Sequence, residues 1–321
     1  MGRYRGILPQ LSGELYITDG RIETTLIFQE GLELPEFAAF DLLKRPRGQQ
    51  VLRKYFRTYG SIARKFGAGL ILESATWRAN PDWAFKIGYT RDELAEANRK
   101  AIELLEEVRA EIEDKKTHVV ISGCVGPRGD GYIPKRVMSP AEAQAYHAEQ
   151  IGTFAYTAAD MITAITMNYA EEAVGVALAA KHAQMPVAIS FTVETDGRLA
   201  TGQTLRSAIE QVDEATALYP AYYMINCAHP SHFAHAVIPN EEWTSRIRGI
   251  RANASRKSHA ELSEATELDA GDPEELALQH RLLKDRLAKL NVIGGCCGTD
   301  HRHVERIAAA CAPLFRRSTF A

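Results

Sequence analysis

Three cysteines carry the strongest chemical signal in this sequence. Cys296 and Cys297 are adjacent in the GGCCGT segment of residues 294–299, and Cys227 closes an apolar run far upstream. Neighbouring cysteines rarely bridge each other, because a disulfide needs its α-carbons further apart than one peptide usually allows. Two thiolates from a glycine-rich turn suit a soft cation better, and three with an open fourth position are typical of a catalytic zinc site. We therefore predict that Cys227, Cys296 and Cys297 bind Zn²⁺.

A zinc ion with three thiolate ligands favours one class of reaction. A thiol bound at the fourth position would lose its proton, because coordination stabilises the thiolate. The anionic protein ligands would keep that sulfur nucleophilic, which fits attack on an activated methyl group. Activation of water fits less well, since hydrolytic zinc usually has more neutral ligands such as histidine.

The elements that must position these cysteines alternate between short apolar runs and amphipathic helical patterns. Strands are predicted at residues 15–19, 69–74, 118–124, 161–166, 186–193, 221–226, 246–253 and 291–295. Helices are predicted near residues 48–66, 91–114, 170–184, 205–218 and 303–315, and others start at Ser139, Asp272 and about His229. Strands alternating with helices imply a parallel sheet. With no clear linker, the pattern predicts an α/β fold, a single-domain (β/α)8 TIM barrel over residues 1–321.

The predicted strands end in residues that can do chemistry. In such barrels the active site lies on the loops at the carboxyl ends of the strands. The residues at those positions are Asp19, Glu73, Cys124, Glu194, Cys227 and Cys296. The polar stretch at residues 253–271 is predicted to be a long loop on the same face.

Composition excludes several other classes of function. The chain has 321 residues, 45% of them hydrophobic, a net charge of −3 and a pI of about 6.4, so no basic field recruits nucleic acid or anionic lipid. No run reaches the length of a membrane span, and the N-terminus lacks the apolar stretch of a signal peptide. Five cysteines are too few for a secreted disulfide framework. We expect a cytoplasmic protein with reduced thiols. The sequence leaves open whether it forms a homo-oligomer.

The sequence resembles the homocysteine S-methyltransferase family over nearly its whole length. These are zinc-dependent (β/α)8 barrels that move a methyl group to a thiol. The most specific marks are the GGCCGT segment and Asn226-Cys227, and weaker ones are Thr18-Asp19-Gly20 and residues 122–127 and 186–191. The resemblance implies that the three cysteines bind zinc and act in catalysis. It also implies that the reaction belongs to methionine biosynthesis. It also implies that Asp19 helps to hold the acceptor by pairing with its ammonium group.

Two departures from the family pattern concern the acceptor. Ile165 stands where the family typically has a glutamate that accepts the amino group, and Arg21 replaces the second glycine of Asp-Gly-Gly. Either a displaced carboxylate takes over, or the acceptor is not homocysteine. The candidate carboxylates are Glu23, Glu73 and Glu194. The other substrate-binding candidates are Thr166, Asn226 and Trp77, whose ring could stack on a cationic donor.

These observations predict a zinc-dependent S-methyltransferase with two small-molecule partners. A sulfonium or quaternary ammonium donor would give its methyl group to a thiol acceptor such as homocysteine. One alternative is an enzyme of the same fold with a non-homocysteine acceptor or a corrinoid-protein partner. The other is a non-catalytic zinc-containing barrel that binds a small molecule.

Overall fold

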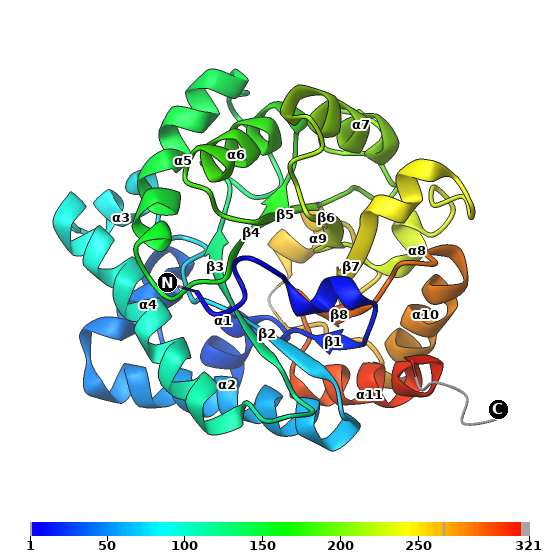
Figure 1. Cartoon of the computed structure of the whole chain (residues 1–321), viewed down its shortest axis with the longest axis horizontal. Coiled ribbons are helices and arrows are strands. Elements are labelled where there is room, and N and C mark those ends of the chain that lie inside the picture. Colours follow the sequence, from blue (N-terminus) through cyan, green and yellow to red (C-terminus); the bar gives the residue numbers. More distant parts are fainter. Residues whose placement is uncertain (1, 266, 316–321) are drawn as a thin grey trace.

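Eight parallel strands close into a barrel in the computed structural model, which describes residues 2–265 and 267–315 (Figure 1). Each strand pairs with the next, and β8 pairs with β1. The strands are β1 Tyr16–Ile17, β2 Gly69–Glu73, β3 Val119–Val125, β4 Met161–Met167, β5 Val187–Phe191, β6 Tyr222–Asn226, β7 Ile247–Ala252 and β8 Val292–Gly295. The predicted α/β barrel is confirmed.

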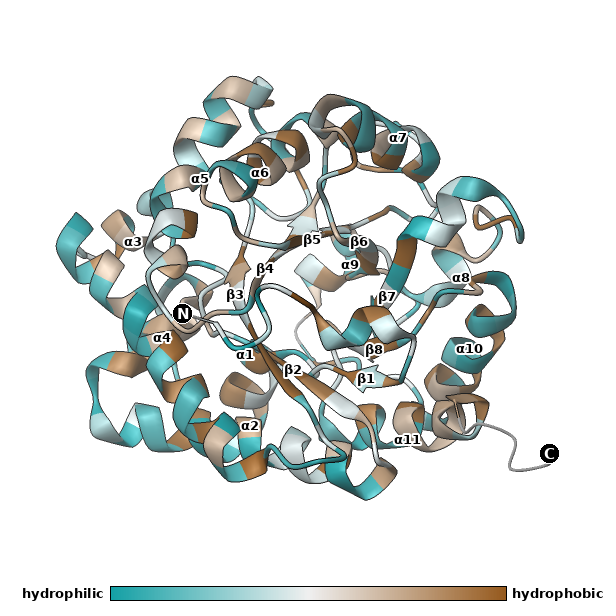
Figure 2. Cartoon of the chain, in the orientation of Figure 1, coloured by the Kyte–Doolittle hydropathy of each residue, from teal (hydrophilic) through white to brown (hydrophobic). Residues whose placement is uncertain are grey.

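Amphipathic helices form the outer layer. The long ones are α2 Pro46–Phe66, α4 Arg91–Ile112, α5 Pro140–Ala155, α6 Ala170–His182, α7 Leu205–Thr216, α10 Pro273–Arg286 and α11 His301–Cys311. The short ones are α1 Ile22–Thr24, α3 Pro81–Lys86, α8 Pro230–Phe233 and α9 His259–Glu264. Tighter or wider helical turns are η1 Pro9–Ser12, η2 Thr25–Gln29, η3 Pro35–Phe37, η4 Ala39–Lys44, η5 Glu242–Arg246 and η6 Ala312–Phe315. Figure 2 shows hydrophobic residues along the strands and mixed hydropathy around the helices, because each helix buries one face against the barrel.

Capping residues fix several helix starts as the sequence predicts. Thr90 and Glu93 form a reciprocal capping box at α4, and Ser139 and Glu142 form one at α5. Asp272 caps α10 by accepting from the Glu274 N–H at 2.9 Å.

Several segments differ from the prediction, among them the short helix α3, which was not predicted. The helix expected after β6 is only the single turn α8, and Pro239 follows soon after, where it disfavours further helix. The loop expected at residues 253–271 contains α9, and its residue 266 lies outside the described part. The stretch 20–45, which had no predicted structure, forms α1 and the turns η2, η3 and η4.

The amino ends of the strands are closed by the N-terminal segment, which crosses the barrel in Figure 1. Leu8 packs there in an apolar cluster with Tyr16, Met161 and Met224, and Gln10 is fully buried. Substrates must therefore reach the barrel from the carboxyl ends of the strands.

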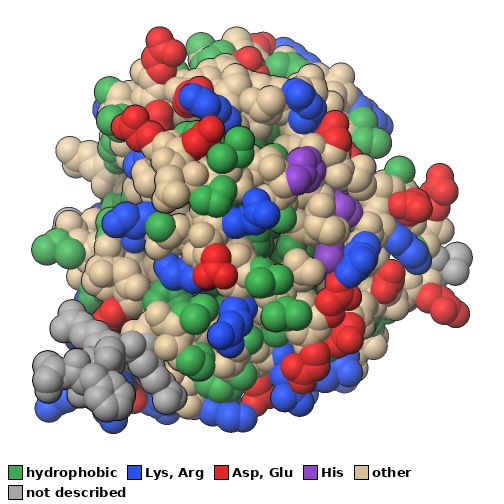
Figure 3. All heavy atoms as spheres, turned by 90° about the vertical axis from the view of Figure 1, so that its right-hand side faces the viewer, with side chains coloured by type: hydrophobic (Ala, Val, Ile, Leu, Met, Phe, Trp, Pro, Cys, Tyr) green, Lys and Arg blue, Asp and Glu red, His purple; other side chains and the backbone are tan. Residues whose placement is uncertain are grey.

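The surface shows no single-sign field on the side drawn in Figure 3, where basic and acidic side chains are both spread over the face. In the described ranges, every helix is too short or too polar to cross a bilayer.

Candidate active site

The three predicted cysteines meet at the carboxyl ends of β6 and β8. The α-carbons of Cys227 and Cys296 are 5.3 Å apart and their sulfurs are in contact. The Sγ atoms of Cys227, Cys296 and Cys297 all lie within 4.8 Å of one another. Cys227 and Cys296 are buried, whereas Cys297 is partly exposed. Thiolates this close repel one another unless they share a positive ion or are oxidised.

Asn226 holds the backbone from which Cys227 projects. Its side chain accepts from the Thr166 N–H at 3.0 Å and from the Ser190 hydroxyl at 2.6 Å, and it donates to the Thr166 hydroxyl at 2.9 Å. Cys227 and Thr166 both have left-handed backbone conformations, with φ of 53° and 69°. Non-glycine residues adopt this region at a cost, and such strain persists where surrounding contacts fix it. Asn226 and Thr166 therefore position Cys227.

Asn253, which follows β7, connects the two cysteine segments. Its Nδ2 donates to the Cys227 carbonyl at 2.9 Å, and its Oδ1 accepts from the Cys297 N–H at 3.0 Å. His259 of α9 also bonds the Cys227 carbonyl, through Nε2 at 2.6 Å, and its ring stacks on Tyr132 with centroids 4.1 Å apart. The segment that follows β7 thus fixes the backbone of both cysteine segments.

Two further side chains contact the cysteine sulfurs. Arg21 Nη1 lies 3.8 Å from Cys296 Sγ and 3.9 Å from Cys227 Sγ. The Tyr132 hydroxyl lies 3.3 Å from Cys297 Sγ. Burial and the adjacent Cys297 sulfur raise the pKa of Tyr132 well above its ordinary value. Tyr132 therefore stays a neutral hydroxyl that can donate to a thiolate.

Asp19 and Glu73 lie at the mouth of the barrel on either side of one buried cation. Arg251 of β7 pairs with Glu73, and with Asp19 at 2.5 Å. Asp19 also accepts from the Tyr55 hydroxyl at 2.7 Å. Burial raises the pKa of Glu73 to about 7, and the two carboxylates raise the pKa of Arg251 in spite of its burial. Arg251 thus neutralises much of the negative charge at this point.

The other predicted substrate residues are divided between the site and its rim. Glu23 pairs with Arg21 at 2.5 Å. The Arg21 guanidinium carbon lies 4.4 Å from the centroid of the Trp77 ring. Trp77 also packs with Cys124 and Ile165. Glu194 is farther out: its side chain is 38% exposed and bonds His259 Nδ1 at 3.2 Å.

Two neighbouring cavities lie at the barrel mouth and share Arg21, Glu23 and Trp77 in their walls. The inner cavity measures about 40 Å³ and is lined by residues that include Asp19, Glu73, Trp77, Ile165 and Cys296. The outer cavity measures about 420 Å³, and Cys297, Arg21 and Trp77 lie in its wall. Phe28 and Phe37 of the η2–η3 segment, Leu262 of α9 and Leu268, which follows α9, complete that wall. The outer cavity is large enough for a small molecule beside the cysteines.

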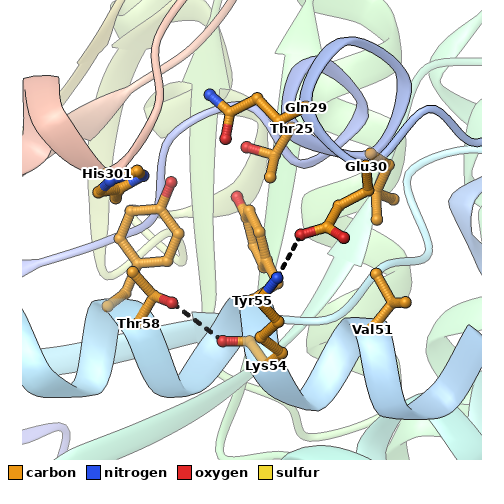
Figure 4. A pocket seen from close by; sticks show the side chains of 10 residues that line it. Thr25, Gln29, Glu30, Val51, Lys54, Tyr55, Thr58 and His301 are labelled. Carbon is orange, nitrogen blue, oxygen red and sulfur yellow. Dashed lines mark hydrogen bonds and ion pairs between the residues drawn. The ribbon is translucent and has the colours of Figure 1, made fainter.

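A third cavity, of about 200 Å³, lies outside the barrel between α2 and η2 (Figure 4). Its charged residues neutralise each other, since Lys54 pairs with Glu30 at 2.7 Å. Tyr55 lines it and directs its hydroxyl to Asp19. This cavity lies behind the barrel mouth and contains none of the three cysteines.

The donor set fits a soft divalent metal ion. A tetrahedral zinc ion with bonds of about 2.3 Å would need its sulfurs about 3.8 Å apart. The trio lies within 4.8 Å, but Cys227 and Cys296 are joined as a disulfide and would have to be reduced and separate to hold the ion. A metal ion held by three sulfurs would have room for a further ligand, and Cys297 lines the outer cavity.

Comparison with known proteins decides the family. The family model described as homocysteine S-methyltransferase matches residues 16–311. The chain belongs to this family. It is a methyltransferase, as the sequence predicts.

Solved structures share the fold of this homocysteine S-methyltransferase family member. The metallated form of the homocysteine methyltransferase MmuM from Escherichia coli is 18% identical, with a TM-score of 0.69, and the match covers 92% of this chain and 96% of that one. The oxidized form of the same protein is 19% identical, with a TM-score of 0.71 and the same coverage. At this identity the likeness shows the fold alone. No curated protein matches the sequence.

Sequence reasoning missed several residues of this site. Arg251 lies inside the predicted strand 246–253, where a charge among buried residues is itself a signal. Asn253 ends the same predicted strand, at the type of position that supplied the other candidates. Tyr132, His259 and Arg78 carry no comparable signal, because only the folded loops bring them to the barrel mouth.

Proposed function

We propose that this enzyme transfers a methyl group from a sulfonium or quaternary ammonium donor to a thiol acceptor such as homocysteine, with Zn²⁺ bound by Cys227, Cys296 and Cys297. The observation that supports it most is the gathering of three sulfurs from two distant segments beside a cavity of about 420 Å³. Bound zinc would stabilise the thiolate form of the acceptor at neutral pH.

The chain's own residues would hold and orient the reactants. Asn226, Thr166 and Asn253 fix the cysteine backbone, and Tyr132 can donate to Cys297. Trp77 offers an aromatic face to a cationic donor. Asp19, Glu23 and Glu73 are the predicted acidic residues that line the cavities, and Glu194 lies at the rim. Asp130, Glu267 and Asp269 also line the outer cavity. Holding the two reactants in line would supply much of the acceleration.

The transfer balances without a further reagent. The acceptor thiol would release its proton to solvent on binding, and its sulfur lone pair would form the new carbon–sulfur bond. The bond from the methyl carbon to the positive sulfur or nitrogen of the donor breaks, and its electron pair stays on the donor. The products are a thioether and a neutral donor remnant.

Because the proposal needs reduced cysteines, it also places the enzyme in a reducing compartment, the cytoplasm. The reactants are small molecules. This part of the proposal is supported by the thiol chemistry of the site.

Replacement of one cysteine tests the proposal. Cys297→Ala should lose both stoichiometric zinc and methyl transfer to a panel of thiols, measured by atomic absorption and by product formation. Cys311→Ala is the matched control, because Cys311 is buried in α11 away from the trio and should keep both. Full transfer by Cys297→Ala would contradict the metal role. Bound zinc without transfer from any sulfonium or quaternary ammonium donor would favour the non-catalytic alternative.

A further inference from the structure

The inner end of the site offers a poor environment for an ammonium group. Ile165, which packs against Trp77 and Cys124, contributes only an apolar side chain to the inner cavity. Each carboxylate that lines this cavity already has an arginine partner: Arg251 for Asp19 and Glu73, and Arg21 for Glu23. An ammonium group that enters the inner cavity would have to displace one of these pairs; the carboxylates of Asp130, Glu267 and Asp269 line only the outer cavity.

Arg78 presents the opposite situation, a buried cation without an ion-pair partner among the described residues; Asp130 and Glu23 raise its pKa only from beyond ion-pair distance. It lines the outer cavity and is 9% exposed. Its Nη1 donates to the Gly129 carbonyl at 3.0 Å, but its Nε is buried and has no hydrogen-bond partner. Within residues 2–265 and 267–315, no carboxylate forms an ion pair with it. A buried guanidinium in this state is costly unless a ligand supplies the missing acceptor and charge.

Aromatic contacts hold the Arg78 guanidinium in place. Its central carbon lies 3.5 Å from the centroid of the Trp83 ring and 4.4 Å from that of Trp77. The Trp83 indole N–H donates to the same Gly129 carbonyl at 3.1 Å. Burial lowers the pKa of Arg78 to about 10, and it still carries its charge at neutral pH. The guanidinium is thus preorganised for an oxyanion.

Trp77 and Arg21 connect this cation to the cysteine sulfurs. Trp77 lies 4.4 Å from the guanidinium carbon of Arg21 as well as from that of Arg78. Arg21 in turn contacts the sulfurs of Cys227 and Cys296. Arg78 and Cys297 line the same cavity, of about 420 Å³.

We propose that Arg78 binds the acid group of the acceptor, so that the preferred substrate class is a small thiol with a carboxylate or sulfonate and no requirement for an ammonium group. This inference rests on the proposed function, because only that function makes the bound molecule a methyl acceptor. The sulfur would lie at the cysteine trio, and the oxyanion would accept from the unpartnered Nε of Arg78.

Binding of the thioether product tests the proposal without metal or turnover. The probes are 3-(methylthio)propionate, its methyl ester and 2-(methylthio)ethylamine, titrated calorimetrically into the reduced, metal-free protein. The acid should bind at least about tenfold more tightly than the ester or the amine. Equal affinity for the three probes would overturn the proposal, and this comparison needs no variant.

Variants identify the residue. Arg78→Gln should lose the preference for the acid and leave ester binding unchanged, whereas Arg78→Lys should retain part of the preference. Lys86→Gln is the matched control, because the exposed Lys86 ammonium also stacks on Trp83, at 3.9 Å, but does not line the cavity. It should bind all probes as the wild type does. Loss of the acid preference in Arg21→Gln but not in Arg78→Gln would overturn the assignment to Arg78.

Methyl-transfer assays separate this inference from the proposed function. Transfer to 3-mercaptopropionate in preference to cysteamine would support both. Tight, Arg78-dependent binding of the acid probe without transfer to any thiol would refute the proposed function and support the anion site. Transfer to homocysteine that is unchanged in Arg78→Gln, with no transfer to 3-mercaptopropionate, would overturn only the inference.

Discussion

The Oδ1 atom of Asn253 accepts a hydrogen bond from the backbone N–H of Cys297 at 3.0 Å. The other end of the same amide donates to the Cys227 carbonyl at 2.9 Å. One buried side chain thus fixes the separation of the two cysteine segments. These segments follow β6 and β8, and Cys227 and Cys296 are 69 residues apart in the sequence. Partners of this kind orient the groups that bind a metal and contribute to its affinity.

Asn253→Ala should weaken zinc binding by about 10- to 100-fold, because both cysteine segments lose their common partner. Competition with a chromophoric chelator measures the affinity. The control is Asn291→Ala, since the buried Asn291 amide also bonds two backbone carbonyls, of Gln10 and Glu14, but at the closed end of the barrel. That variant should lose stability and keep its zinc affinity. Equal zinc affinities in the two variants would contradict the role of Asn253.

Arg251→Gln should lower the free energy of unfolding by about 3–5 kcal/mol, because it leaves Asp19 and Glu73 buried without their cation. The loss should be smaller at pH 5.5 than at pH 8, since the unpaired carboxyls are then protonated more readily. Urea denaturation at the two pH values measures both effects. Arg57→Gln, which breaks the exposed pair with Glu111, should cause little change at either pH. A loss that is independent of pH would show that the destabilisation comes from packing instead.

Ala217→Gly should raise the free energy of unfolding by roughly 1 kcal/mol. Ala217 is the exposed C-terminal cap of α7 and has a left-handed φ of 56°, which glycine adopts without steric cost. Ala110→Gly, at an exposed position inside α4, is the matched control and should lower the same quantity by about 1 kcal/mol. Thermal and urea denaturation measure the two shifts, and shifts of the same sign would refute the explanation.

His280→Leu should flatten the pH dependence of stability. His280 is fully buried in α10, and burial lowers its pKa to about 4 from an ordinary value of 6.5. Between these values the unfolded chain binds a proton that the folded chain does not, so the free energy of unfolding falls as the pH falls. The contribution is roughly 2 kcal/mol between pH 8 and pH 5.

Urea denaturation of wild type and variant over this range isolates the histidine, because the other titrating groups contribute equally to both. His182→Gln removes an exposed histidine at the end of α6 and should leave the slope as it is. An unchanged slope in His280→Leu would mean that another buried group controls the acid sensitivity.

The alternation of apolar runs and amphipathic helices determined the barrel by itself. Parallel strands need helical crossovers, and an uninterrupted series of such units has few ways to close. The same pattern placed Asp19, Glu73, Cys227 and Cys296 at one end of the barrel, because strand ends in a parallel sheet face the same way. Local chemistry also sufficed for the capping boxes at Thr90 and Ser139, whose partners are three residues away.

Only the tertiary structure decided which of these groups pair with one another. Asp19 and Glu73 converge on Arg251 because strands that are distant in sequence are close around the barrel. The stacking of Arg78 on Trp83 depends on the path of the loop after β2. Contacts such as that of Tyr132 with Cys297 join residues far apart in the chain. They are selected by the free energy of loop closure and packing, which produces no periodic pattern in the sequence.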